Sequence, residues 1–140
     1  MRLKLITLAG KKIDEEIYEA IIPTTEGEIA VFPGHEPLVV LTVPGVITVR
    51  FDKSHDDSKL ELFAISGGVA EISQTIIRVL VDEADHGDDI IEAHSQAALE
   101  RAMKMRDEAE DQIEIEKAQQ LIDRHAVRLK VAELHRRKRL

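Results

Sequence analysis

Histidine is the residue type best suited to acid–base catalysis or metal binding, but the histidines of this sequence are scattered along the chain. They stand at positions 35, 55, 86, 94, 125 and 135, without the i, i+4 pair and glutamate that mark a zinc-protease helix. The nearest approach to a metal site is residues 86–89 with His94, which together contain two histidines and two aspartates. These residues also have the composition of a solvated linker, which is the interpretation we favour.

No other group of residues forms a pattern that could run a reaction. Gly67 and Gly68 lie in SGGVAEI without a following Lys-Ser/Thr pair or helix, which argues against a phosphate-binding loop and predicts a tight hairpin turn. The carboxylates form solubilising surface clusters, as at residues 14–16, and the absence of cysteine excludes thiolate chemistry. We therefore predict no catalytic, cofactor or metal site in this sequence.

Glycine and proline divide the sequence into two parts of different character. All seven glycines and all four prolines lie at or before Gly87, and the 53 residues that follow contain neither. Glycine and proline mark turns, whereas a stretch that lacks both and is rich in Ala, Glu, Lys, Arg and Gln favours helix. We therefore predict a β-domain over residues 1–86 and a helical arm over residues 87–140.

The first part has the pattern of a series of short strands. Apolar runs rich in β-branched residues, such as 29–32, 46–51 and 76–81, alternate with turn signals such as Pro44-Gly45. Connections this short favour antiparallel neighbours, since a parallel crossover needs a dozen residues or more. The predicted fold class is α+β, with an N-terminal antiparallel β-sandwich or flattened barrel followed by a C-terminal two-helix hairpin.

Two apolar stripes run along the helical part. The first follows helical spacing and comprises Ala98, Ala102, Met105, Ala109 and Ile113. The second begins at Ala118 and includes His125, which we expect to be a hydrogen-bonded packing residue. The alternation at residues 113–116 breaks the period and predicts a turn between antiparallel helices over about 94–114 and 117–138. One continuous helix of more than about 40 residues is the alternative, because no Gly, Asn or Pro enforces the turn.

Charge is distributed unevenly along the chain. The net charge is −7 over residues 1–86 and −6 over residues 87–120, but +5 over residues 121–140. The resulting basic tip comprises Arg124, Arg128, Lys130, Arg136, Arg137, Lys138 and Arg139. Its cations complement the dipole of their own helix, but a run of four consecutive basic residues exceeds that need and favours binding to an acidic partner.

The hydrophobic segments are too short or too interrupted to act as a signal peptide or to span a membrane. Lys4 lies inside the first apolar stretch, which argues against a signal peptide. The longest charge-free run, residues 38–49, contains Pro44 and Gly45 and cannot span a bilayer. Any association with a membrane is therefore expected to be indirect.

Residues 22–38, IPTTEGEIAVFPGHEPL, form the most specific motif in the sequence. Pro33 and Pro37 fix the backbone of the loop between them and exclude helix, so the loop is stiff. Together with PGVITV and AISGGVAEI downstream, the motif closely resembles the ε subunit of F-type ATP synthases. The resemblance covers essentially the whole chain.

The resemblance implies a ten-stranded β-sandwich that binds the γ subunit and sits on the ring of membrane c subunits, so that all turn as one rotor in the central stalk. The matching ring-contact positions are Glu28, Pro33, Gly34, His35 and Glu36. It also implies that the C-terminal helices permit rotation when folded down. When extended along γ into the α and β subunits, they block ATP hydrolysis. We thus expect a non-catalytic F1-sector subunit serving ATP synthesis and proton or other ion transport, peripheral to the cytoplasmic face of a bacterial membrane.

One motif of these relatives is incomplete here. Some bacterial ε subunits bind ATP through Ile/Leu-Asp-x-x-Arg-Ala, where this sequence has AALERA at residues 97–102. Arg101 and Ala102 match, but Ala98 replaces the aspartate. We predict no ATP binding of useful affinity.

Two other functions are compatible with parts of the sequence. A β-domain adaptor with a basic helical tail could bind nucleic acid or another acidic partner. However, the net charge of −13 over residues 1–120 would repel phosphates, and aromatic stacking residues are scarce. A small enzyme with a carboxylate or histidine site would instead show turnover without any partner protein.

Overall fold

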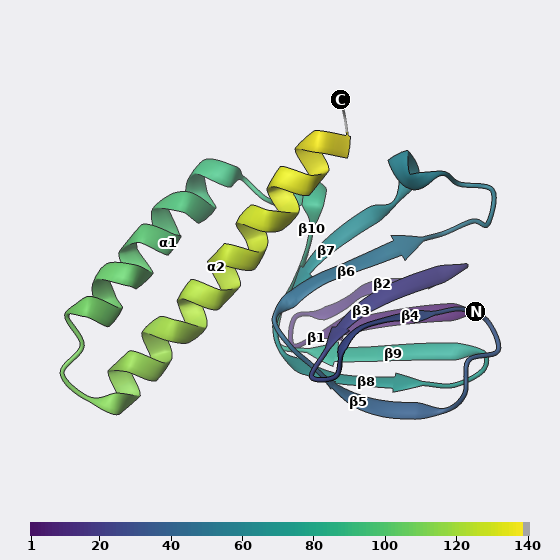
Figure 1. The fold of residues 1–140 in the computed structure, drawn as a ribbon, viewed down its shortest axis with the longest axis horizontal. Coiled ribbons are helices and arrows are strands. Elements are labelled where there is room, and N and C mark those ends of the chain that lie inside the picture. The colour runs from purple at the N-terminus through teal and green to yellow at the C-terminus, as the bar shows by residue number, and fades with distance from the viewer. Residues whose placement is uncertain (139–140) are drawn as a thin grey trace.

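The computed structural model describes residues 1–138 as ten strands followed by two long helices (Figure 1). The strands are β1 (Arg2–Thr7), β2 (Gly10–Glu16), β3 (Glu19–Thr24), β4 (Gly27–Val31), β5 (Leu38–Thr42), β6 (Gly45–Arg50), β7 (Glu61–Ile65), β8 (Gly68–Ile72), β9 (Ile76–Val81) and β10 (Ala84–His86). A short 3-10 turn, η1 (Asp57–Lys59), precedes β7, and a second, η2 (Gly87–Asp89), follows β10. The two helices are α1 (Glu92–Asp107) and α2 (Gln112–Lys138). The predicted fold class is confirmed.

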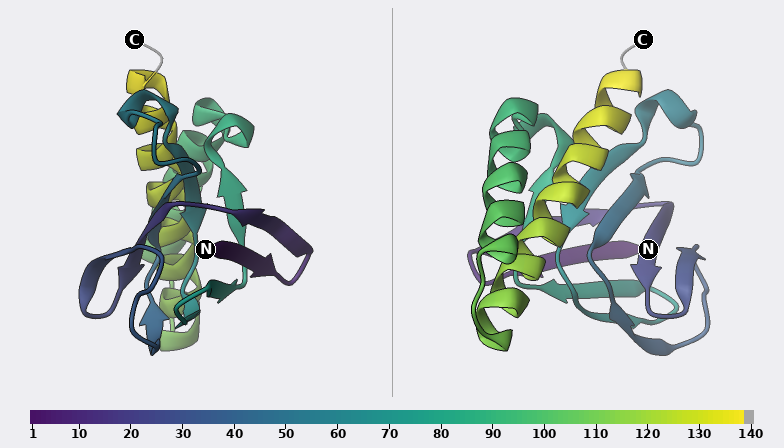
Figure 2. Two further views of the ribbon diagram at one scale, coloured as in Figure 1. Left: turned by 90° about the vertical axis from the view of Figure 1, so that its right-hand side faces the viewer. Right: turned by 60° about the vertical axis from the view of Figure 1, so that its left-hand side comes forward.

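The strands pair in the order β10-β7-β6-β3-β5-β8-β9-β1-β2, with β4 added to β3, and the sheet folds over itself into a sandwich (Figure 2). Every pairing is antiparallel except that of β1 with β9, which is parallel. The antiparallel prediction rested on short connections. It does not apply to β1 and β9, because most of the β-domain lies between them in sequence and no tight turn fixes their relative direction.

Aliphatic side chains fill the space inside the sandwich. On β1 the residues alternate, so that Leu3 and Leu5 are fully buried while their neighbours face outward. Ile22, Ile47 and Ile77 are likewise inaccessible to solvent. The pleat thereby turns one side of each strand toward the core and leaves the other side for the surface.

Gly67 and Gly68 do not form the predicted hairpin turn. β7 pairs with β6 and β10, whereas β8 pairs with β5 and β9, so the chain crosses here from one part of the sheet to another. A Cβ atom at Gly68 would lie 1.9 Å from the carbonyl oxygen of Leu80. Glycine is required at this position because of that close backbone approach.

The two helices form an antiparallel hairpin, but the turn lies at residues 108–111 and not at the predicted 113–116. The Asp111 carboxylate accepts a hydrogen bond from the backbone N–H of Glu114 at 2.8 Å, and the Glu114 carboxylate accepts one from the backbone N–H of Glu110 at 3.0 Å. This capping arrangement starts α2 earlier than the apolar pattern indicates. Ile113, predicted to lie on the buried stripe of the first helix, is 65% exposed on the second.

α2 lies between α1 and the sandwich (Figures 1 and 2). Val131 is fully buried in a second apolar cluster with Val46, Leu62 and Ala64 of the sandwich, against which Ile90, Val127 and Leu134 also pack. The arm is therefore folded against the β-domain. Within residues 1–138, no helix combines the length and the apolar character needed to cross a bilayer.

Candidate functional site

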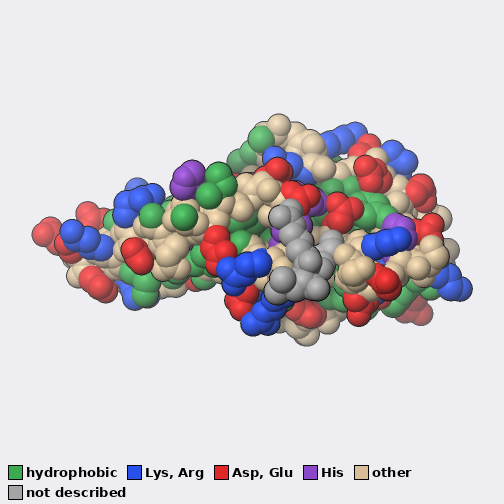
Figure 3. All heavy atoms as spheres, turned by 90° about the horizontal axis from the view of Figure 1, so that it is seen from above, with side chains coloured by type: hydrophobic (Ala, Val, Ile, Leu, Met, Phe, Trp, Pro, Cys, Tyr) green, Lys and Arg blue, Asp and Glu red, His purple; other side chains and the backbone are tan. Residues whose placement is uncertain are grey.

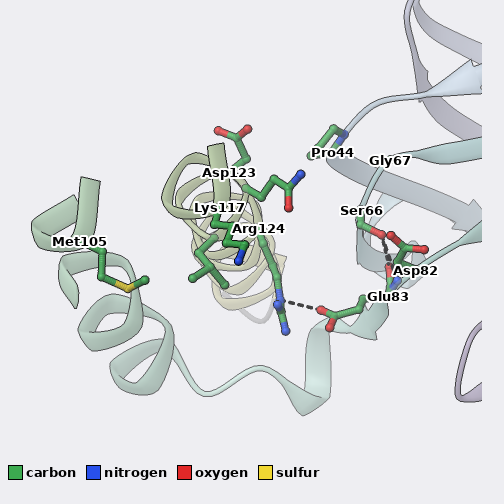
Figure 4. Close-up of a pocket in the computed structure, with 11 residues that line it drawn as sticks. Pro44, Ser66, Gly67, Asp82, Glu83, Met105, Lys117, Asp123 and Arg124 are labelled. Atoms are coloured by element: carbon green, nitrogen blue, oxygen red, sulfur yellow. Dashed lines mark hydrogen bonds and ion pairs between the residues drawn. The ribbon is translucent and has the colours of Figure 1, made fainter. Parts of the chain in front are cut away.

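Ion pairs join one face of α2 to the end of the β-domain. The Nε atom of Arg124 lies 2.6 Å from a carboxylate oxygen of Glu83, in the turn between β9 and β10 (Figure 4). One turn further along α2, the Nη2 and Nε atoms of Arg128 donate to Asp85 on β10 at 2.6 and 3.1 Å. Both residues of the second pair are about a quarter exposed, with 26% for Arg128 and 27% for Asp85, so bulk water screens it only in part.

A third contact extends this row toward the end of α2. The His135 Nε2 atom lies 2.5 Å from an Asp88 carboxylate oxygen in η2, an ion pair when the imidazole is protonated. We call Glu83, Asp85 and Asp88 with Arg124, Arg128 and His135 the latch. Its members come from the sandwich border and from α2, and together they fix the position of the arm.

The periods of strand and helix explain why the first two latch pairs coincide. Glu83 and Asp85 are two residues apart on extended backbone, a distance of about 6.6 Å. Arg124 and Arg128 are four residues apart on a helix, a rise of about 6 Å. The two spacings nearly match, so both pairs form at once with α2 in a single register.

His86, a candidate metal ligand, takes part in protein contacts instead. Its Nδ1 atom accepts a hydrogen bond from the backbone N–H of Asp88 at 3.0 Å, so its Nε2–H donates to Glu61 at 2.8 Å. His94 is exposed on the first turn of α1. Residues 1–138 contain no group of three or more side chains arranged to hold a metal ion.

The rest of the predicted basic tip is divided among different contacts. Arg136 pairs with Glu92 at the start of α1 at 2.9 Å, and Arg137 pairs with Glu133 on its own helix at 2.7 Å. Lys130 is exposed, Lys138 ends α2, and Arg139 lies outside the described residues. Figure 3, which looks onto this end of the molecule, shows acidic and basic side chains of the described residues interspersed.

His125 lies among the latch arginines without the hydrogen bond that we expected for a packing histidine. Its side chain is partly buried, and its Nδ1 atom has no hydrogen-bond partner among residues 1–138. Burial lowers the pKa of its imidazole, and the positive charges of Arg124, Arg128 and Arg101 lower it further. The structure therefore favours the neutral form of this side chain.

A hollow of about 660 Å³ remains between the arm and the sandwich (Figure 4). Its walls carry charges of both signs, with Lys117 and Arg124 from α2 opposite Asp82 and Glu83 from the sandwich. Met105 of α1 supplies an apolar wall. The hollow exists only while the arm is folded, because the two halves of its lining belong to different parts of the molecule.

The predicted ring-contact residues do not lie together. Glu28 is the second residue of β4, whereas Pro33 to Glu36 follow its other end, so the strand separates them. The backbone N–H of Gly34 donates to the carbonyl oxygen of Gln74 at 2.9 Å and ties this loop to the β8–β9 turn. Gly34 has a φ of 87°, and the Nδ1–H of His35 donates to the carbonyl oxygen of Glu36 at 2.7 Å, so local contacts hold the loop in one shape.

An exposed apolar row, not anticipated from the sequence, crosses the outside of the sandwich. Leu41 of β5 lies opposite Val69 of β8, Val69 lies opposite Leu80 of β9, and Leu80 lies opposite Ile6 of β1. Leu41 is 58% exposed and Leu80 is 40% exposed. We call these four residues the outer row. The sequence of β5, LVVLT, gives little sign of it, because a strand without alternation reads as buried on both sides.

Comparison with known proteins agrees with this architecture. Residues 1–87 match the model of the family described as ATP synthase, Delta/Epsilon chain, beta-sandwich domain. The ATP synthase epsilon chain of Rippkaea orientalis is 36% identical over 137 residues, covering 94% of this chain and 97% of its own length. The ATP synthase epsilon chain 2 of Photobacterium profundum is 30% identical over 138 residues, covering 99% and 92%.

Two solved structures share the fold at low sequence identity. A chain of the Euglena gracilis mitochondrial ATP synthase superposes with a TM-score of 0.77 at 24% identity, over 95% of this chain and 80% of its own. A chain from the central stalk and c-ring of the Tetrahymena thermophila mitochondrial ATP synthase gives a TM-score of 0.60 at 13% identity, over 94% and 96%. The sandwich, the folded helical hairpin and the full-length relatives together show that this chain belongs to the ATP synthase epsilon chain family.

Proposed function

We propose that this protein is a non-catalytic rotor subunit of an F-type ATP synthase, in which the sandwich joins the γ subunit to the c-ring and the arm regulates ATP hydrolysis. On this proposal it works at the cytoplasmic face of a bacterial membrane and is held there by the complex. The observation that carries the proposal is the outer row, a solvent-exposed apolar strip on an otherwise charged, hydrogen-bonded sandwich. Exposed apolar patches on rigid domains are typical of protein-binding surfaces.

The outer row is the proposed docking site for γ. Leu41 and Leu80 are about half exposed in the isolated chain, so a partner that covers them gains roughly half of the 1.5–3 kcal/mol that burial of a fully exposed leucine gives. Because the row lies on paired strands, its side chains are already positioned and lose little entropy on docking. Such a surface suits a joint that must transmit torque without slipping.

Substitution of the outer row tests this docking site. We expect Leu41→Ser with Leu80→Ser to weaken binding of the purified γ subunit at least about tenfold, measured by calorimetry, because two apolar contacts are lost. Glu71→Ser with Arg78→Ser is the matched control, since these residues lie opposite each other on the same two strands β8 and β9. Equal losses in both variants, or no loss in the first, would contradict the proposed site.

The c-ring contact is proposed for only one end of the sandwich. Glu28 lies near the start of β4 and His35 follows its other end, so we propose that only one of them faces the ring. The sequence has no cysteine, so Glu28→Cys and His35→Cys each create a unique crosslinking site. In the assembled complex we expect one of the two to crosslink to a c subunit and the other to a different subunit or to none. Crosslinking of both to c would contradict this arrangement.

The arm is proposed to regulate hydrolysis by leaving the sandwich and meeting the α and β subunits. Its contacts with the sandwich are the latch and the small apolar cluster around Val131, which leaves it much less firmly held than a core element. A competing acidic surface on a neighbouring subunit offers the same partners to Arg124 and Arg128 that Glu83 and Asp85 offer here. The equilibrium between the two positions then depends on the difference between these affinities.

A further inference from the structure

We propose that His125 makes the folded position of the arm sensitive to acid, because protonation of its imidazole weakens the latch and favours release of α2. The idea concerns the equilibrium of the isolated chain. Its consequence in the complex, greater inhibition of hydrolysis at low pH, rests on the proposed function of the arm.

The position of His125 in α2 supports this role. It follows Arg124 directly and precedes Arg128 by three residues, so both latch arginines flank it on its own helix. The side chain is partly buried, and no residue among 1–138 accepts a hydrogen bond from its buried Nδ1 atom. A proton added at Nδ1 would therefore lack an acceptor as long as the arm stays folded.

Charged groups from each neighbouring element act on this imidazole. Arg101 faces it from α1, Arg124 and Arg128 act from α2, and Glu83 acts from the sandwich. Glu83 and Asp85 are already engaged by Arg124 and Arg128. A protonated His125 adds a further positive charge to a site where three arginines face two carboxylates, and the added repulsion opposes the folded arm.

The sign of the pH dependence follows from the lowered pKa of His125 in the folded arm. When α2 leaves the sandwich, the imidazole enters water and its pKa returns toward the ordinary value of about 6.5. The released arm therefore binds a proton more readily than the folded arm. The neutral imidazole therefore leaves the folded arm at its full stability above the ordinary pKa. The free energy that holds the arm in place decreases as the pH falls below that value.

Two other histidines lie against carboxylates at the sandwich border, and the experiment must separate them from His125. The His135 Nε2 atom lies beside a carboxylate oxygen of Asp88, and the His86 Nε2 atom lies 2.8 Å from a carboxylate oxygen of Glu61. Both lie near η2, at the end of the latch farther from His125. The contribution of His125 is therefore measured as a difference between the parent chain and a variant that lacks only this imidazole.

The proposal can be tested in the full-length chain by fluorescence energy transfer. Lys53 in the loop after β6 and Glu116 on α2 are exposed, and Lys53→Cys with Glu116→Cys gives a labelled pair in a sequence that otherwise lacks cysteine. We expect the ratio of released to folded arm to rise in the parent as the pH falls from about 8 to about 5.5. In His125→Gln this rise should be smaller by a factor of about three or more. His94→Gln, which removes an exposed histidine from α1, should behave like the parent.

An NMR titration of the His125 imidazole in the full-length chain provides a second readout that does not depend on a stable variant. We expect its pKa to lie below the ordinary histidine value of about 6.5. The same dependence on pH in the parent and in His125→Gln, or a pKa of His125 at or above that ordinary value, would overturn the proposal. Either result leaves the role of the arm in the assembled complex untouched, because both measurements use the chain alone.

Discussion

Gly68 occupies a position where two strands approach too closely for a side chain. A Cβ atom there would meet the carbonyl oxygen of Leu80 at 1.9 Å, and a backbone carbonyl within a sheet cannot move aside. We expect Gly68→Ala to lower the free energy of unfolding by about 3 kcal/mol, measured by chemical denaturation. Gly67→Ala is the matched control, because its Cβ would lie 3.3 Å from the Thr42 carbonyl oxygen, and it should cost about 1 kcal/mol. Equal losses would contradict the close approach.

Asp14 links the stability of the first hairpin to pH. Arg2 donates a hydrogen bond to its carboxylate at 2.6 Å and Lys11 donates a second at 3.2 Å, and these bonds lower the pKa of Asp14, that from Arg2 most strongly. Because the folded pKa lies below the ordinary value of about 3.9, the stabilisation is complete above that value and is lost as the pH falls through the lowered pKa. In an NMR titration, Arg2→Gln should raise the pKa of Asp14, whereas Lys59→Gln should not. An unchanged Asp14 titration in Arg2→Gln would exclude Arg2 as the main cause.

At the level of elements, the sequence predicted the kinds of structure better than their junctions. The period of the apolar residues indicated two helices but misplaced the turn, since it ignored Asp111 and Glu114, whose side chains bind backbone N–H groups at the start of α2. Gly67 and Gly68 were recognised as a turn but not as a crossing between distant strands. That distinction depends on pairing partners far away in the sequence, which local patterns do not contain.

The pairing of α2 with the sandwich border can be measured by a double-mutant cycle. We expect Arg128→Gln and Asp85→Asn each to increase the released fraction of the arm. The coupling energy between them should be about 1 kcal/mol at low salt and should fall as salt is added. Arg137→Gln with Glu133→Gln is the matched control, since that ion pair lies within α2 and does not join it to the sandwich. A coupling of zero for Arg128 and Asp85 would remove this pair from the latch.

For the whole molecule, the sequence indicated strands followed by helices but not the arrangement of surfaces. The loss of glycine and proline after Gly87 coincides with the end of β10 and with residue 87, where the family match ends. That the two parts fold independently stays a prediction. Glu28 and His35 were assigned to the ring contact by resemblance, which does not indicate that β4 lies between them, and their contact with the ring stays a prediction. The outer row gathers four strands whose order in the sheet differs from their order in the chain.

Removal of the arm distinguishes the two proposed roles, because it separates coupling by the sandwich from regulation by the helices. The measurement is ATP hydrolysis together with ATP-driven ion pumping by an assembled ATP synthase whose copy of this chain lacks residues 88–140. We expect the complex to assemble, ion pumping to remain coupled to hydrolysis, and hydrolysis to become faster or less regulated. A complex that fails to assemble, or that hydrolyses ATP without pumping, would contradict it.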